Sequence, residues 1–167
     1  MALAANFQGD VYITGGLTPT TFNPPAGCIN DNAVVAGAAI DAAKLQHQHE
    51  KAYAQESATT AVSEARVVHV VQGATATLVA FKAGCVVANV GAATVTVNLK
   101  KNGTTVLTAV VTLDNSQAAY AVVAAAGFTS TSLVAGDVLE VVFTAAASGG
   151  TLGKGAFAQV VLREKAS

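Results

Sequence analysis

Histidine is the residue of this chain best suited to acid–base or metal chemistry, and two of the three histidines, His47 and His49, stand two positions apart. The residues around them favour a helix, and on a helix side chains two apart point about 200° away from each other. One ion is therefore not expected to bind both. We expect His47 on a polar helix face and His49 packed and hydrogen-bonded. The alternative is a threefold cluster of His49 side chains, stacked or holding an ion on an oligomer axis.

The other candidate groupings do not predict catalysis. His69 alternates with Val68 and Val70, as a surface or interface residue of a strand would. No GxSxG motif and no Cys/His pair at a catalytic spacing occurs. The glycine-rich residues 149–155 lack the GxxxxGK[ST] spacing of a phosphate loop and fall between predicted strands, so they predict a hairpin. We expect no enzyme, no metal site and no cofactor.

The acids, cysteines and tyrosines predict structural roles. The acidic residues form no DxDxDG calcium loop, and Asp137 after Gly136 is typical of a turn in which the carboxylate caps backbone N–H groups. Cys28 and Cys85 are expected to be small buried hydrophobes. The few aromatic residues are expected to pack in the interior, namely Tyr53, Tyr120 and Phe128.

The composition excludes several classes of protein. Hydrophobic residues make up 52% and charged residues 11% of the 167 residues, with a net charge of -1, whereas soluble domains carry about 25% charged residues. No basic field exists for nucleic acid, and no run of about 20 apolar residues could span a membrane. The first ten residues do not resemble a signal peptide, so we expect synthesis in the cytoplasm. So few charges favour a chain whose surface is partly covered by other chains.

The N-terminal region, residues 1–57, predicts an extended arm followed by one helix. Residues 1 to about 33 contain all three prolines and hydrophobic residues without a helical period, which favours a segment that orders against a partner. From Ala33 to Glu56 good helix formers follow the N-cap candidates Asn30, Asp31 and Asn32. Heptad a and d positions then fall on Val35, Ala38, Ala42, Leu45, His49 and Ala52, which we expect to pack in an oligomer.

The C-terminal region, residues 66–167, predicts an antiparallel β-sandwich or jelly roll of about eight strands, separated from the helix by a linker over residues 58–65. Residues 75–81 and 85–90 predict two separate strands, divided at Gly84. Residues 94–99 alternate, with Val95, Val97 and Leu99 on one face. Asn102-Gly103 then supplies a hairpin turn. Turn residues recur every 8 to 15 residues up to the last predicted strand, residues 157–164, which is the spacing of a sandwich.

These patterns together resemble a known family. The stretches VTVNLKKNGTTVLTAVVTL, LVAGDVLEVVF and AQVVLRE, with FNPPAGCINDNAV and AAKLQHQHEKAYAQ before them, resemble the small β-sandwich proteins of tailed-phage virions, which serve as capsid decoration (cement) proteins and head fibres. The resemblance implies a structural protein on the virion surface, a homotrimer at threefold positions of the shell, and the major capsid protein as partner.

The resemblance also implies a role for the arm. Its expected capsid contacts are Phe7, Val11, Tyr12, Ile13, Phe22, Pro24 and Pro25. The alternative function is a receptor- or glycan-binding module of a head or tail fibre, which would need exposed aromatic and polar side chains in the loops. The loops are mostly Gly, Ala, Ser and Thr, which favours decoration.

Overall fold

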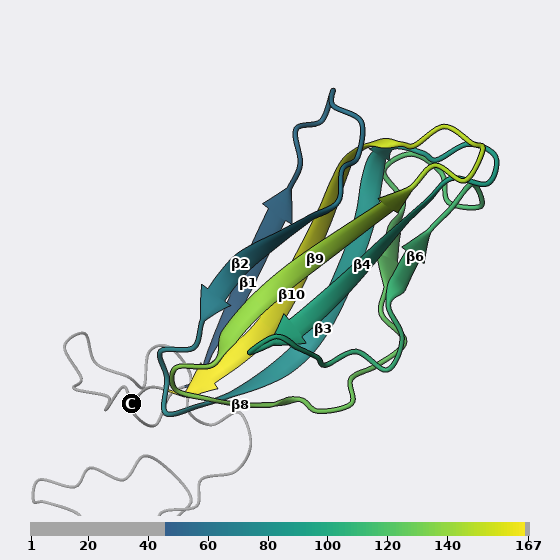
Figure 1. Ribbon diagram of the computed structural model, residues 1–167. Helices are drawn as coiled ribbons and strands as arrows, with labels where there is room; N and C mark the ends of the chain where they lie inside the picture. Colours follow the sequence, from purple (N-terminus) through teal and green to yellow (C-terminus); the bar gives the residue numbers. More distant parts are fainter. Residues whose placement is uncertain (1–45, 166–167) are drawn as a thin grey trace, which may run out of the picture. The chain divides into compact units, whose positions relative to one another are not determined.

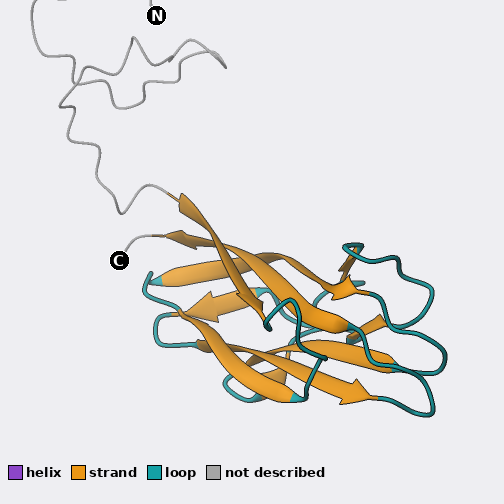
Figure 2. Ribbon diagram, turned by 90° about the horizontal axis from the view of Figure 1, so that it is seen from above, coloured by secondary structure: helices purple, strands orange, loops and turns teal. Residues whose placement is uncertain are grey.

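The computed structural model describes residues 46–165, which form a β-sandwich of two antiparallel sheets with five strands each. Figures 1 and 2 show the two layers face to face. No helix occurs in this range. The strands are β1 Gln46–Ala54, β2 Glu64–Val70, β3 Thr75–Val87, β4 Thr94–Lys101, β5 Thr104–Thr105, β6 Val111–Leu113, β7 Val122–Ala124, β8 Ser132–Val134, β9 Val138–Ala146 and β10 Lys154–Lys165.

The strand order places β1 and β2 on one side of the sandwich and the short strands on the other. The first sheet has the order β1-β10-β3-β7, with β8 also paired to β3. The second has the order β2-β9-β4-β5, with β6 also paired to β4. The chain therefore changes sheet repeatedly, as in the passage from β1 to β2 and from β9 to β10.

Period-two alternation builds the core. Val95, Val97 and Leu99 of β4 are fully buried, and their strand neighbours are half-buried. β9 follows the same pattern with Leu139, Val141 and Phe143. Because alternate side chains of a strand point to opposite faces, these residues meet the inward side chains of β3 and β10 between the sheets. The predicted sandwich is confirmed.

The predicted hairpin turn and the predicted carboxylate cap are confirmed at neighbouring positions. Asn102 and Gly103 have φ angles of 49° and 81°, the left-handed conformation of a two-residue hairpin turn. Asp137 Oδ2 accepts a hydrogen bond from the Val134 backbone N–H at 2.9 Å, and its Oδ1 accepts one from Asn102 Nδ2 at 2.7 Å. The turn before β9 is thus tied to the β4–β5 hairpin.

The helix prediction is wrong over residues 46–54, which form β1. This strand pairs with β10 along its whole length, from Gln46 opposite Lys165 to Ala54 opposite Phe157. The composition of β1 favours a helix, but pairing with a strand more than 100 residues away overrides that preference. The sandwich accordingly begins before residue 66, and residues 55–63 connect two of its strands.

Other expectations need smaller corrections. The predicted strands at 75–81 and 85–90 are one long strand, β3, and β8 was not predicted. Residues 149–153 lie between β9 and β10, and β10 begins at Lys154. These two strands belong to different sheets, so the segment is a connection between sheets and not a hairpin. Residues 1–45, with the predicted arm and the first half of the predicted helix, lie outside the described residues.

Candidate functional site

Polar side chains of the described residues gather where the edges of the two sheets meet, along β1 and β2. We call this region the polar seam: β1, β2, their connection 55–63, and Glu164 of β10. β1 and β2 run side by side in Figure 1, each at the edge of its own sheet. The inward face of β1 presents His47, His49, Lys51 and Tyr53, opposite inward residues of β10.

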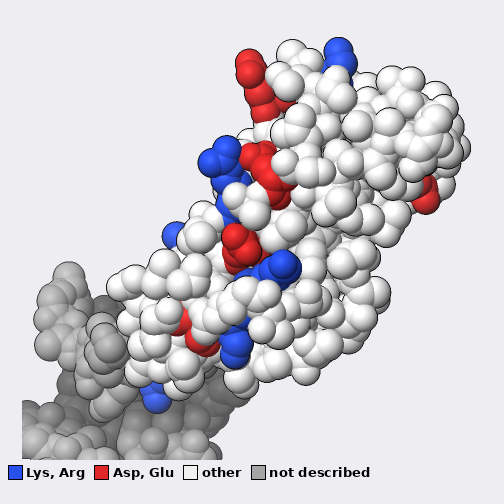
Figure 3. Space-filling view, viewed as in Figure 1, with Lys and Arg blue, Asp and Glu red and all other residues white. Residues whose placement is uncertain are grey.

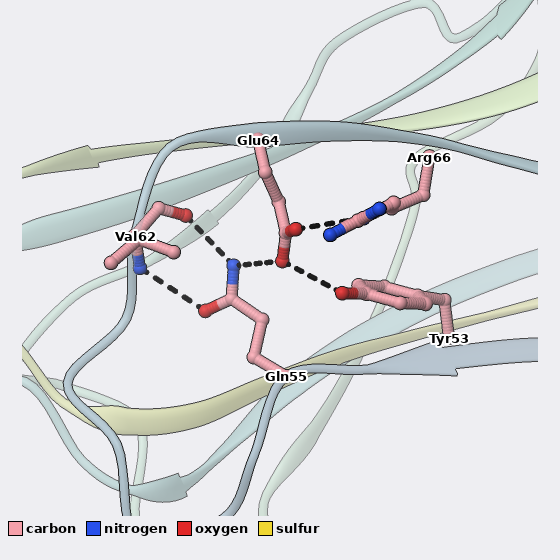
Figure 4. A network of polar contacts seen from close by, with 5 residues as sticks. All are labelled: Tyr53, Gln55, Val62, Glu64 and Arg66. Carbon is pink, nitrogen blue, oxygen red and sulfur yellow. Dashed lines mark hydrogen bonds and ion pairs between the residues drawn. The ribbon is translucent and has the colours of Figure 1, made fainter.

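The first cluster of the polar seam, shown in Figure 4, fastens the connection between β1 and β2. Gln55 Nε2 donates to the Val62 carbonyl at 2.8 Å and to Glu64 Oε1 at 2.7 Å, and Gln55 Oε1 accepts from the Val62 N–H. Tyr53 Oη donates to the same Glu64 oxygen at 3.0 Å. Arg66 Nε donates to Glu64 Oε2 at 2.9 Å. The cluster uses both carboxylate oxygens for structure.

The pKa of Glu64 agrees with a structural role of its carboxylate. Burial by itself raises the pKa of the Glu64 carboxyl, but hydrogen bonds from Gln55, Arg66 and Tyr53 outweigh it and hold the pKa below its usual value. The Arg66 guanidinium also lies over the Tyr53 ring at 5.6 Å, a distance at which a cation and a ring attract. Glu64 therefore stays ionised and bound at neutral pH, and is no proton donor.

The second cluster brings together all three histidines of the chain. The ring centroids of His47 and His49 are 6.4 Å apart, and those of His49 and His69 are 6.2 Å apart. The helix-based expectation that His47 and His49 diverge is wrong, because residues two apart on a strand share a face. His69, expected on a surface or at an interface, has a side chain only 10% exposed.

Glu164 is the acceptor of this second cluster. Its Oε1 lies 2.9 Å from His69 Nε2 and 3.2 Å from the Gln72 N–H, and its Oε2 lies 3.3 Å from His49 Nε2. Burial by itself raises the pKa of Glu164, but the hydrogen bonds from His69 and Gln72 and the charges of His69 and His49 lower it overall. No group of three or more His, Cys, Asp or Glu in the described range is arranged to hold a metal ion.

The structure separates the residues predicted to act together. His49 and Ala52 were placed on one helix stripe, but on β1 they lie on opposite faces, His49 inward and Ala52 outward. The remaining predicted packing residues, Val35, Ala38, Ala42 and Leu45, and the predicted arm contacts, Phe7, Val11, Tyr12, Ile13, Phe22, Pro24 and Pro25, lie outside the described residues. Cys85 is buried as predicted, and Cys28 lies outside that range.

The side of the sandwich opposite the polar seam is almost free of charge. We call residues 102–136, which contain β5 to β8, the neutral flank; its one charged side chain is Asp114. Figure 3 shows the charged residues in a band toward the β1–β2 side and a broad uncharged area over the side of β6. Four large apolar side chains of the flank are exposed: Val110 at 41%, Tyr120 at 71%, Val122 at 56% and Val134 at 56%.

Tyr120 was expected in the interior, and that expectation is wrong. Its backbone has a φ of 62°, an unfavourable conformation for a residue with a Cβ. The Tyr120 N–H donates to the Cys85 carbonyl at 2.8 Å, and the Ala121 N–H donates to the Ala118 carbonyl at 3.1 Å. The loop therefore holds an aromatic side chain outward. Tyr53 and Phe128, by contrast, pack against the core as predicted.

Sequence reasoning missed the neutral flank as a site, although its signal was available: 35 consecutive residues carry a single charge. Exposed apolar area with few charges and an aromatic side chain is typical of the centre of a protein–protein interface.

No protein-family model matches this chain, and no curated protein matches it either. Among residues 46–165, no helix is long and apolar enough to cross a membrane.

Proposed function

We propose that this chain is a structural virion protein that binds the outer surface of a phage capsid, stabilises the shell and acts as a homotrimer. The observation that carries the proposal is the neutral flank, where the Tyr120 side chain is 71% exposed. The family resemblance of the sequence supplies the partner, the major capsid protein. Attachment without chemistry agrees with a polar seam in which Glu64 and Glu164 are occupied by structural hydrogen bonds.

Burial of the neutral flank supplies a physical reason for binding. Removing apolar surface from water contributes about 25 cal/mol per Å² before the costs of association. Because the flank carries one charge, its burial would cost little free energy for the desolvation of ions. More of the favourable free energy of apolar burial would therefore count toward binding. A trimer would add further attachment points and raise the avidity for a repeating shell.

The proposal is tested by mixing the purified full-length protein with undecorated capsids and measuring co-sedimentation. Tyr120→Ser should weaken binding by at least tenfold, because tyrosine is enriched among the few interface residues whose truncation costs about 2 kcal/mol or more. Val122→Ser should weaken it less. The matched control is Val67→Ser, because Val67 is 60% exposed on β2, away from the flank. Failure of the wild-type protein to bind capsids would show that the proposal is wrong.

A fragment that begins at Gln46 separates the flank from the N-terminal residues. If residues 1–45 are the main anchor, the fragment will lose capsid binding, and if the flank suffices, it will retain it. Starting instead at Ala58 would remove β1 and confuse anchoring with folding. Light scattering of the full-length protein gives its molar mass in solution and so tests whether it forms a trimer.

The second candidate function is a receptor- or glycan-binding module, and the exposure of Tyr120 favours it. Sugar-binding sites commonly stack a ring on an exposed aromatic side chain. A glycan array distinguishes the two functions: a strong hit that Tyr120→Ser abolishes, together with unchanged capsid binding, would support the receptor-binding module.

A further inference from the structure

The outer face of the sheet β1-β10-β3-β7 carries a shallow hollow of about 230 Å³. Four neighbouring strands contribute the residues that line it: Ala52, Tyr53, Ala54, Lys82, Val122, Phe157, Ala158 and Gln159. Most of them fall in two cross-strand rows. One row joins Ala54, Phe157 and Val122 across Gly84, and the next joins Ala52, Gln159 and Lys82. The lining is mainly apolar. Tyr53 is the one lining residue that also belongs to a polar cluster of the seam.

Gly84 accounts for the shape of the hollow. A Cβ at this position would lie 2.5 Å from Phe157 Cζ and 2.4 Å from the Ala121 carbonyl oxygen. The absence of a side chain at Gly84 therefore lets the Phe157 ring lie across β3. Val122 is 56% exposed beyond it. The alanines of β1 add no bulk, so the space between Phe157, β1 and Val122 stays open.

Lys82 is the one charged residue that lines this hollow. Among residues 46–165 it forms no ion pair within 4.0 Å. Glu50, an acid on the next row of the same face, accepts a hydrogen bond from Gln159 Nε2 at 3.2 Å. The hollow thus combines apolar walls with the Lys82 ammonium group, which has no ion-pair partner on its own sheet. A matching ligand has an apolar group beside a carboxylate.

We propose that this hollow docks a short segment of a partner protein in which an apolar side chain stands next to an aspartate or glutamate. The apolar side chain enters between Phe157 and Val122, and the carboxylate pairs with Lys82. The extended shape of the two rows suits an extended segment that crosses the strands. The proposal does not depend on the capsid function, although a capsid protein could supply such a segment.

The test uses a pair of peptides and the full-length, isotope-labelled protein. The probes are acetyl-Ala-Leu-Asp-Ala-amide and its uncharged counterpart acetyl-Ala-Leu-Asn-Ala-amide, followed by NMR titration in low salt. Both peptides should shift the amide signals around Ala52, Lys82, Val122 and Phe157. The Asp peptide should bind about threefold more tightly, because an exposed ion pair contributes modestly, and 0.5 M salt should remove the difference.

Variants make the result specific to the hollow. Lys82→Gln should remove the preference for the Asp peptide, whereas Arg163→Gln should keep it, because Arg163 lies on the same face but outside the lining. Ala52→Phe should abolish binding of both peptides by filling the space. Ala52 is exposed, so the fold should persist, as the unchanged amide spectrum of the remaining residues would show.

Three results would overturn the proposal: no localised shifts with either peptide, equal affinity for both peptides, or a Lys82→Gln variant that behaves like Arg163→Gln. Capsid binding is read separately. If the protein binds the peptides but not capsids, the hollow is a docking site and the proposed capsid function is wrong. If it binds capsids but not the peptides, the capsid function stands and the proposed docking site is wrong.

Discussion

Glu164 is the single residue on which the second cluster of the polar seam depends. It is 6% exposed, and its two oxygens are contacted by side chains of β1 and β2 and by one backbone N–H group. A buried carboxylate of this kind is stabilising only while its hydrogen-bond donors remain in place, since an unpaired buried charge is costly. The residue thus joins three strands from two sheets.

Glu164→Gln should lower the free energy of unfolding at pH 7 by about 1–3 kcal/mol, the cost of weakening hydrogen bonds to a buried charged group. The pKa of Glu164 is lowered in the folded protein, so its contribution is present above the unfolded pKa of about 4.3 and is lost as pH falls through the folded pKa. Urea titrations from pH 7 to pH 3 should therefore show the difference between wild type and variant shrinking toward acid.

The control for this pH series is Glu56→Gln, because the Glu56 side chain is exposed. Its unfolding free energy should stay within about 0.5 kcal/mol of wild type throughout. A pH-independent difference for Glu164→Gln would mean that the carboxylate charge does not contribute.

Gln55 has the corresponding role in the first cluster, where its amide bridges Val62 and Glu64. Gln55→Ala should destabilise the fold by about 2 kcal/mol, since it removes several part-buried hydrogen bonds and leaves the Val62 backbone and Glu64 without these partners. Gln48→Ala is the matched control, because Gln48 is exposed and has only a 3.4 Å contact with Arg163. Thermal unfolding of both variants checks this; equal melting temperatures would contradict it.

At the scale of elements, the β4–β5 hairpin depends on backbone conformation. Gly103 has a φ of 81°, and a Cβ there would meet no atom within 4 Å. Gly103→Ala should therefore cost about 1 kcal/mol through the left-handed conformation alone. Gly127→Ala, where a Cβ would make ordinary contacts at 3.6 Å with Thr108, should be neutral or slightly stabilising. Chemical denaturation compares the two, and an equal cost would contradict the conformational explanation.

The strands that sequence reasoning predicted correctly are those whose signal is local. β4 and β9 alternate between buried and half-buried residues along their lengths, and Asn102-Gly103 marks its own turn. β1 has no such signal, because its Gln, Lys, Glu and Ala residues favour a helix. Its strand conformation depends on pairing with β10. β3 was divided at Gly84 because glycine usually ends a strand, whereas here it gives room to Phe157.

The candidate surfaces also differ in whether their signal is local in the sequence. The composition of residues 102–136 is visible in the sequence, so the neutral flank was predictable. The hollow combines residues from β1, β3, β7 and β10, and the histidine cluster combines β1, β2 and β10. Such sites require the register of strands distant in sequence. Once β1 had been read as a helix, neither of them could be predicted.

At the scale of the whole described range, residues 46–165 form a sandwich with unlike sides, polar along β1 and β2 and neutral along β5 to β8. β1 belongs to the folded unit, although none of the side chains described on it is fully buried. Residues 46–167 should therefore unfold in one transition. Residues 58–167, which lack β1, should be less stable by on the order of 2 kcal/mol through loss of Tyr53 packing on Phe143.

Calorimetry of the two fragments tests this boundary. Residues 46–167 are the reference, and residues 58–167 should unfold at a lower temperature. Equal stability of the two fragments would show that β1 is dispensable and that the sandwich proper begins near residue 64.

The pairing of Gln46 with Lys165 has a mechanical consequence. β1 and β10 are antiparallel, so these residues lie together at one end of the sheet. A force that pulls them apart acts on one backbone hydrogen bond after another and opens the pair like a zipper. A force directed along β1 from Gln46 against the opposite end of the sandwich loads the whole ladder at once. The same strand is therefore compliant to tension between residues 46 and 165 and resistant to tension along its own axis.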